Sequence, residues 1–224
     1  MKTVIVIPAY NEESTIAKVL AEVKPLFPNI IVIDDGSTDN TYQIAKGLGV
    51  TVLRHMINRG LGGALGTGFQ AALLNQADIV VTFDADGQHQ VEDISRLIKL
   101  IIEGQADVVI GSRMKDRKGM PLHRQLANVV GNLVTKLLFG IWVSDSQSGL
   151  RAFSRQAASQ ININSNEMEV SSEIINEIHV HQLRLTEIPI APIYTDYSLS
   201  KPQGQNFITG LKTLLKLIMI KITK

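Results

Sequence analysis

The chain has 224 residues, a length sufficient for one α/β domain with a full core. Its composition, 45% hydrophobic and 19% charged, is typical of a folded domain and not of a disordered chain. Its 22 basic and 21 acidic side chains give a formal charge of +1, which argues against a nucleic-acid partner. Cysteine is absent, so any metal must be bound by oxygen or imidazole ligands. No apolar stretch approaches the roughly 20 residues of a membrane-spanning helix, and Pro8 interrupts the short N-terminal run, so we expect a cytoplasmic protein.

Short apolar runs alternate with amphipathic segments through the first half of the chain. The apolar runs predict strands at Val4–Ile7, Ile30–Ile33, Val50–Leu53, Ile79–Phe83 and Val108–Ile110. Helical spacing predicts helices at Ile16–Val23, from Thr38 or Asp39 onward, at Gln70–Leu74 after a glycine-rich loop over Gly60–Gly68, and at Ile94–Ile102. The less regular second half predicts a helix at Leu126–Phe139, a strand at Leu150–Phe153 and an extended segment at Leu185–Ile193. This alternation predicts an α/β, Rossmann-type fold with a mostly parallel sheet and helices on both faces.

Polar clusters follow four of the predicted strands. In parallel sheets the carboxyl ends of the strands meet at one edge, where ligands bind. We therefore expect one site at this edge, formed by Tyr10-Asn11-Glu12, Asp34-Asp35, Asp84-Ala85-Asp86 and Gly111-Ser112-Arg113.

The cluster Asp84-Ala85-Asp86 is the strongest candidate for metal chemistry. In an extended chain alternate residues share a face, which would place both carboxylates together. Such oxygens suit Mg²⁺ or Mn²⁺ bound to a diphosphate, and Gln88 could add an amide oxygen. The alternative is a solvated turn after a strand, where Asp and Gly are common.

Two other motifs have both binding and structural interpretations. Asp34-Asp35-Gly36-Ser37 could bond a nucleobase or a ribose, or it could cap the entry to a helix. The glycine-rich segment after Asn58-Arg59 fits neither the dinucleotide-binding spacing nor a phosphate loop. Its glycines could let the backbone approach a nucleotide, or they could allow close packing.

Charged side chains later in the chain also leave alternatives open. The basic segment could grip a phosphate through its arginines or be a solvated loop, and it comprises Arg113, Lys115, Arg117, Lys118 and Arg124. The five histidines do not form a metal set. Residues 206–224 form a predicted basic amphipathic helix, separate from a domain at 1–205, that could lie on an anionic membrane surface, dock on the core or make a homo-oligomer contact.

Taken together, these motifs resemble family 2 glycosyltransferases of the GT-A fold, in particular dolichol- and polyprenyl-phosphate sugar transferases, from Val4 to about Lys201. The resemblance implies that Pro8-Ala9-Tyr10-Asn11-Glu12 wraps the nucleotide base, that Asp35 contacts the base or ribose, and that Asn58-Arg59-Gly60 lies near the donor. Asp84-Ala85-Asp86-Gly87-Gln88-His89 is the most specific match. It implies that Asp84, Asp86 and Gln88 bind the metal and diphosphate.

The second half of the chain is similar to the acceptor side of the same family. Arg113 and Arg124 resemble residues that grip the acceptor phosphate, and Asp145–Phe153 resembles the motif that closes the acceptor side. Glu187–Ile190 and Ser200-Lys201 resemble the last motifs, which implies a phosphate contact for Lys201. Dolichol-phosphate mannosyltransferases usually carry an arginine just before that Ser-Lys pair. This chain has Thr195-Asp196-Tyr197 there, so mannose is not implied as the sugar.

The expected reaction is inverting sugar transfer from a nucleotide-sugar to a lipid phosphate, by an enzyme peripheral at the inner face of the membrane. A phosphate acceptor is already ionised, so a strong general base is not needed. With a glycan or protein hydroxyl as acceptor, Asp145 could be the base. A non-catalytic nucleotide-sugar-binding module is the other alternative. A small membrane-anchor protein is a further expected partner, because the chain lacks the membrane helices that some relatives append.

Overall fold

The structure is a computed structural model that describes residues 1–116, 120 and 122–193, without the side chains of His123 and Arg124. Within these residues the strands form a seven-stranded sheet of order β3-β2-β1-β4-β6-β5-β7. The strands are β1 Thr3–Ala9, β2 Ile30–Asp34, β3 Thr51–Arg54, β4 Ile79–Thr82, β5 Val108–Ser112, β6 Arg151–Ser154 and β7 Leu185–Pro189. All neighbouring pairs are parallel except those of β6, which runs antiparallel to both β4 and β5. The predicted mostly parallel sheet is confirmed.

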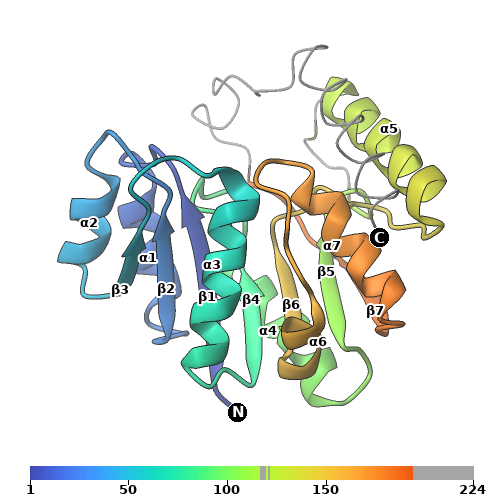
Figure 1. Ribbon diagram of the computed structural model, residues 1–224, viewed down its shortest axis with the longest axis horizontal. Helices are drawn as coiled ribbons and strands as arrows, with labels where there is room; N and C mark the ends of the chain where they lie inside the picture. Colours follow the sequence, from blue (N-terminus) through green and yellow to red (C-terminus); the bar gives the residue numbers. More distant parts are fainter. Residues whose placement is uncertain (117–119, 121, 194–224) are drawn as a thin grey trace.

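Helices cover both faces of the sheet (Figure 1). They are α1 Ile16–Val23, α2 Thr41–Gly47, α3 Gly60–Leu74, α4 Val91–Ile102, α5 Leu122–Phe139, α6 Arg155–Gln160 and α7 Val170–Val180. Successive strand residues point to opposite faces, so Ile5 and Ile7 pack with α1 and α4, whereas Val4 and Val6 pack with α3 and α7. The fully apolar strand runs therefore supply two cores, one on each side of the sheet.

The glycine-rich segment is helical, so the prediction of a loop over Gly60–Gly68 is wrong. A Cβ on Gly68 would lie 2.2 Å from Val6 Cγ1, and one on Gly62 would lie 2.0 Å from the Ser165 carbonyl oxygen. These glycines let α3 pack directly on β1 and on the 165–166 backbone. Their low intrinsic helix propensity is overcome because this packing buries the apolar face of α3.

Other boundaries differ in detail from the sequence-based expectations. Helix α2 begins at Thr41, because Asp39 Oδ1 accepts hydrogen bonds from both the backbone N–H and the hydroxyl of Thr41. The helices α6 and α7 were not predicted. Across the described ranges, no helix is both long and apolar enough to cross a membrane. The predicted helix at 206–224 lies outside these ranges.

Candidate active site

The acidic pair Asp84 and Asp86 lies in a turn after β4. The strand ends at Thr82, and Gly87 has φ 73°, a left-handed conformation that favours glycine. The expectation that the pair shares one face of an extended chain is therefore wrong. The turn that Gly87 allows brings the two carboxylates within electrostatic reach of each other at the carboxyl end of β4.

The pKa values of these two carboxyls are displaced in opposite directions. Burial raises the pKa of Asp86, and the negative charge of Asp84 raises it further. Burial also acts to raise the pKa of Asp84, but the hydrogen bond and charge of His89 oppose it. The positive charges of Arg113 and Arg151 add to this opposition, and the pKa of Asp84 is lowered overall. A divalent cation would relieve the repulsion between the two carboxylates, so this donor pair fits Mg²⁺ or Mn²⁺.

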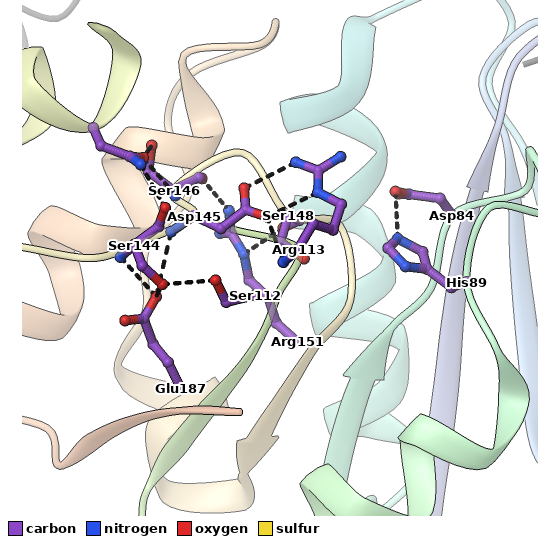
Figure 2. A network of polar contacts seen from close by, with 11 residues as sticks. Asp84, His89, Ser112, Arg113, Ser144, Asp145, Ser146, Ser148, Arg151 and Glu187 are labelled. Carbon is purple, nitrogen blue, oxygen red and sulfur yellow. Dashed lines mark hydrogen bonds and ion pairs between the residues drawn. The ribbon is translucent and has the colours of Figure 1, made fainter. Parts of the chain in front are cut away.

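Gln88 and His89 support the acidic pair. Gln88 donates its backbone N–H to Asp86 Oδ1 at 3.0 Å and its Nε2 to Oδ2 at 2.6 Å, so its amide nitrogen, not its oxygen, faces that carboxylate. His89 is 3% exposed, and its Nε2 lies 3.0 Å from Asp84 Oδ2 (Figure 2). His89 was assigned no role from the sequence, although it ends the Asp84–His89 motif.

The two carboxylates would be only part of a metal's ligand shell. Nowhere in the described part of the chain do three or more acidic or histidine side chains gather as a metal group. A cation held by Asp84 and Asp86 would therefore need oxygens from a bound diphosphate or water, as Mg²⁺ commonly does.

Gly149 lets the loop before β6 lie against Asp84. A Cβ on Gly149 would lie 2.0 Å from Oδ2 and 2.1 Å from Oδ1 of Asp84. Thr82 Oγ1 donates to the Gly149 carbonyl oxygen at 2.7 Å, which ties the loop to the end of β4. The close approach therefore requires glycine at this position.

Arg113 and Asp145 form a two-pronged ion pair on the other side of the site (Figure 2). Arg113 Nε lies 2.8 Å from Asp145 Oδ2, and Nη2 lies 2.9 Å from Oδ1. The Arg113 backbone N–H also donates to Oδ2 at 2.9 Å. Asp145 is 0% exposed. The structure brings together these two predicted site residues, and the arrangement favours Asp145 as the anchor of Arg113 over a role as base.

Arg151 is a buried cation between the two acidic centres. Its Nε donates to the Ser148 carbonyl oxygen at 2.9 Å and its Nη2 to that of Ser146 at 2.7 Å. Burial lowers the pKa of Arg151 to about 10, against the opposing effect of Asp145 and Asp84. The guanidinium is therefore still charged at neutral pH and balances the acidic side chains around it.

Glu187 holds the loop that carries Asp145. Its Oε1 accepts from the Ser144 backbone N–H at 2.8 Å, from the Ser144 hydroxyl at 2.9 Å and from the Asp145 N–H at 3.3 Å. Ser112 at the end of β5 joins through its hydroxyl, 2.6 Å from that of Ser144. The sequence marked Glu187 only as part of a motif, because its partners lie more than 40 residues away.

The motifs after β1 and β2 are bonded to each other. Asn11 has φ 54°, its backbone N–H donates to Ser37 Oγ at 3.0 Å, and its Oδ1 accepts from the Thr38 N–H at 2.9 Å. The Glu12 N–H donates to Thr41 Oγ1 at 2.8 Å. Pro8 and Ala9 belong to β1, and Tyr10 is 43% exposed at the same edge. The predicted donor-binding residues of β1 and β2 thus form one continuous rim.

Asp35 connects this rim to the start of α3. Its Oδ1 lies 2.6 Å from His55 Nδ1 and accepts from the Arg59 N–H at 2.9 Å, while Oδ2 accepts from the Gly60 N–H at 2.7 Å. Asn58 Oδ1 accepts from the same Gly60 N–H at 2.8 Å. Asp35 therefore bonds the start of α3 and does not cap α2, the helix that follows its own motif, and its contact with a base or ribose remains a prediction. The Arg124 side chain and Lys201 lie outside the described residues.

Two cavities differ sharply in their chemistry. One of about 380 Å³ lies at the carboxyl-terminal ends of α1 and α2, and Lys24 is the titratable residue in its lining. The other, of about 140 Å³, borders Asp84 and Arg151. The smaller cavity therefore belongs to the site.

Comparison with known proteins agrees with this geometry. The family model "Glycosyl transferase family 2" matches residues 4–161. An uncharacterized protein of Methanocaldococcus jannaschii is 50% identical, covering 97% of this chain and 91% of its own length. The UDP-N-acetylglucosamine–dolichyl-phosphate N-acetylglucosaminyltransferase of Methanococcus voltae is 40% identical, covering 98% and 96%.

Solved structures share the fold. Glucosyl-3-phosphoglycerate synthase from Mycobacterium tuberculosis, in complex with Mn²⁺ and UDP-glucose, superposes with a TM-score of 0.69 at 19% identity, covering 97% of this chain and 76% of that one. The family match extends from β1 through α6 and so includes the acidic turn after β4. The protein belongs to glycosyl transferase family 2 and is a glycosyltransferase with the GT-A fold.

Proposed function

We propose that this protein transfers a sugar from a nucleoside-diphosphate donor to a polyprenyl phosphate, with inversion and with a divalent metal. The observation that carries this proposal is the acidic pair in the turn after β4, at the carboxyl end of the sheet. The pKa of Asp84 is lowered there and the pKa of Asp86 is raised. The dolichyl-phosphate acceptor of the 40% identical relative supports the acceptor class.

In this reaction an oxygen of the lipid phosphate bonds to the anomeric carbon as the bond from that carbon to the donor diphosphate breaks. When bound, Mg²⁺ or Mn²⁺ would supply charge to stabilise the departing diphosphate. Asp84 and Asp86 would hold it, with His89 fixing Asp84 and Gln88 fixing Asp86.

The acceptor side is built to bind an anion without removing a proton. Arg113 is held in one orientation by Asp145, and a pre-oriented guanidinium is well suited to a phosphate. Because the phosphate is ionised at neutral pH, alignment and charge stabilisation are the main tasks. Transfer to a hydroxyl would need a base, and both Asp145 oxygens already accept hydrogen bonds from Arg113.

We also propose that the enzyme works as a peripheral protein at the inner membrane face, where a polyprenyl phosphate presents its headgroup. The basic amphipathic sequence at 206–224 is the motivation for this location. Removal of residues 206–224 should weaken binding to anionic vesicles in a flotation assay. Equal binding by the shortened chain would contradict the membrane-binding role of this segment. Membrane attachment would then depend on another partner, such as an anchor protein, and the segment would be left to a homo-oligomer contact.

The direct test incubates the full chain with radiolabelled UDP- and GDP-sugars, dolichyl or undecaprenyl phosphate, and Mn²⁺. We expect an acid-labile, organic-soluble product that EDTA abolishes. Arg113→Lys keeps the charge but loses the two-pronged pair with Asp145 that orients it, so it should raise the KM for the lipid phosphate about tenfold. Product formation from a glycan hydroxyl but not from the lipid phosphate would refute the proposed acceptor.

A further inference from the structure

The 140 Å³ cavity beside Asp84 is lined in part by apolar side chains, which do not match the hydroxyl groups of a plain hexose. Apolar side chains form much of its wall: Leu61 and Leu65 from α3, Ile174 from α7, and Met168 from the turn just before α7. A hexose substituent is a hydroxyl, which loses hydrogen bonds to water when it enters an aliphatic pocket. The wall therefore fits a substituent that carries a methyl group.

Polar groups lie in the same lining. Ser148 is 1% exposed, and its hydroxyl is buried without a hydrogen-bond partner. Arg151 contributes a buried guanidinium, and Ser171 adds a second hydroxyl from the first turn of α7. A buried hydroxyl without a partner costs free energy, and a ligand that bonds to it would recover that cost.

The size and position of the cavity restrict what can enter it. At about 140 Å³ the cavity is smaller than the roughly 300–1,000 Å³ of typical ligand pockets, so it fits a part of the donor sugar and not a whole nucleotide-sugar. The cavity borders Asp84, where the proposed function places the diphosphate. The sugar substituent nearest to that diphosphate is the one on the carbon next to the anomeric carbon.

We infer that this cavity binds the 2-acylamino group of the donor sugar, so that the enzyme selects N-acetylated hexosamines over plain hexoses. The methyl lies against the aliphatic wall, the Ser148 hydroxyl donates to the carbonyl oxygen, and the amide N–H donates to the Ser171 hydroxyl. The inference rests on the proposed function for the location of the diphosphate, and it adds which sugar class is transferred.

The first test measures donor binding, which does not depend on the acceptor. With Mn²⁺, the full chain is titrated with UDP-N-acetylglucosamine, UDP-glucose and UDP in a thermal-shift or calorimetric assay. We expect the dissociation constant for UDP-N-acetylglucosamine to be at least about tenfold below that for UDP-glucose. Equal constants for the two sugars would overturn the inference.

Variants then locate the selectivity in the cavity. Ser148→Ala should reduce the preference about five- to tenfold, as expected of one lost hydrogen bond. Ile174→Phe should fill the cavity and abolish the preference. Ile178→Phe is the matched control, because Ile178 is equally buried one turn along α7 but does not line the cavity, and it should keep the preference.

The outcomes separate the two proposals. If Ile174→Phe does not fold, Ser148→Ala still decides, because it removes only one hydroxyl. An unchanged preference in Ser148→Ala would overturn the assignment of the cavity. Lipid product formed equally well from both donors would overturn the selectivity alone. Selective donor binding without any lipid product would overturn the proposed acceptor and leave the cavity assignment standing.

Discussion

Gly149→Ala is expected to disable the enzyme by moving a single carboxylate. The new Cβ would lie 2.0 Å from Asp84 Oδ2, whereas such contacts essentially never fall below 3.0 Å. Asp84 must therefore move by about 1 Å, a displacement that can cost on the order of 100-fold in rate when it affects a group aligned for reaction. Overpacking at such a site typically costs about 1–3 kcal/mol of unfolding free energy.

The assay for this variant compares kcat for lipid-linked product with the free energy of unfolding in urea. Gly131→Ala is the control, because its Cβ would meet nothing closer than Gln147 Nε2 at 3.9 Å. Helical position 131 should tolerate alanine and gain about 0.5–1 kcal/mol. If Gly149→Ala folds and keeps the wild-type kcat, the position of Asp84 does not limit catalysis and the reasoning fails.

Three further changes test other parts of the site. Because the pKa of Asp86 is raised in the folded state, its ionised form opposes folding, and this effect grows as the pH rises above the ordinary value of 3.8. Asp86→Asn should therefore make the metal-free protein more stable than wild type at neutral pH, and this difference should vanish in acid. Metal-dependent turnover should be lost. Equal urea midpoints for the two proteins at all pH values would contradict the raised pKa of Asp86. Arg113→Ala removes the guanidinium that hydrogen-bonds both oxygens of the buried Asp145, and should lower the free energy of unfolding by about 3–5 kcal/mol. Arg113→Ala/Asp145→Ala should restore much of this loss, as a double-mutant cycle would measure. Glu187→Ala should cost about 1–3 kcal/mol and lower activity, whereas Glu187→Gln, which keeps the accepting oxygen, should recover most of both losses in the same assays.

The local sequence was sufficient to predict the position of most strands of the sheet. The apolar runs at Val4–Ile7, Ile30–Ile33 and Ile79–Phe83 correspond to β1, β2 and β4, because a strand buried on both faces requires apolar side chains at every position. Parallel pairing then places the polar residues that follow these strands at one edge. The acidic turn after β4 could therefore be identified before its geometry was known.

The tertiary structure decided what depends on contacts distant in sequence. The glycines of α3 predicted a loop, and only their packing against Val6 and residues 165–166 explains why this segment is helical. The pairing of Arg113 with Asp145 and the hold of Glu187 on that loop join segments separated by 32 or more residues. The sequence alone determines which side chains follow each strand. The partner of a buried charge depends on the fold, because a charge in the interior needs an opposite charge or hydrogen-bond donors from segments that are distant in the sequence.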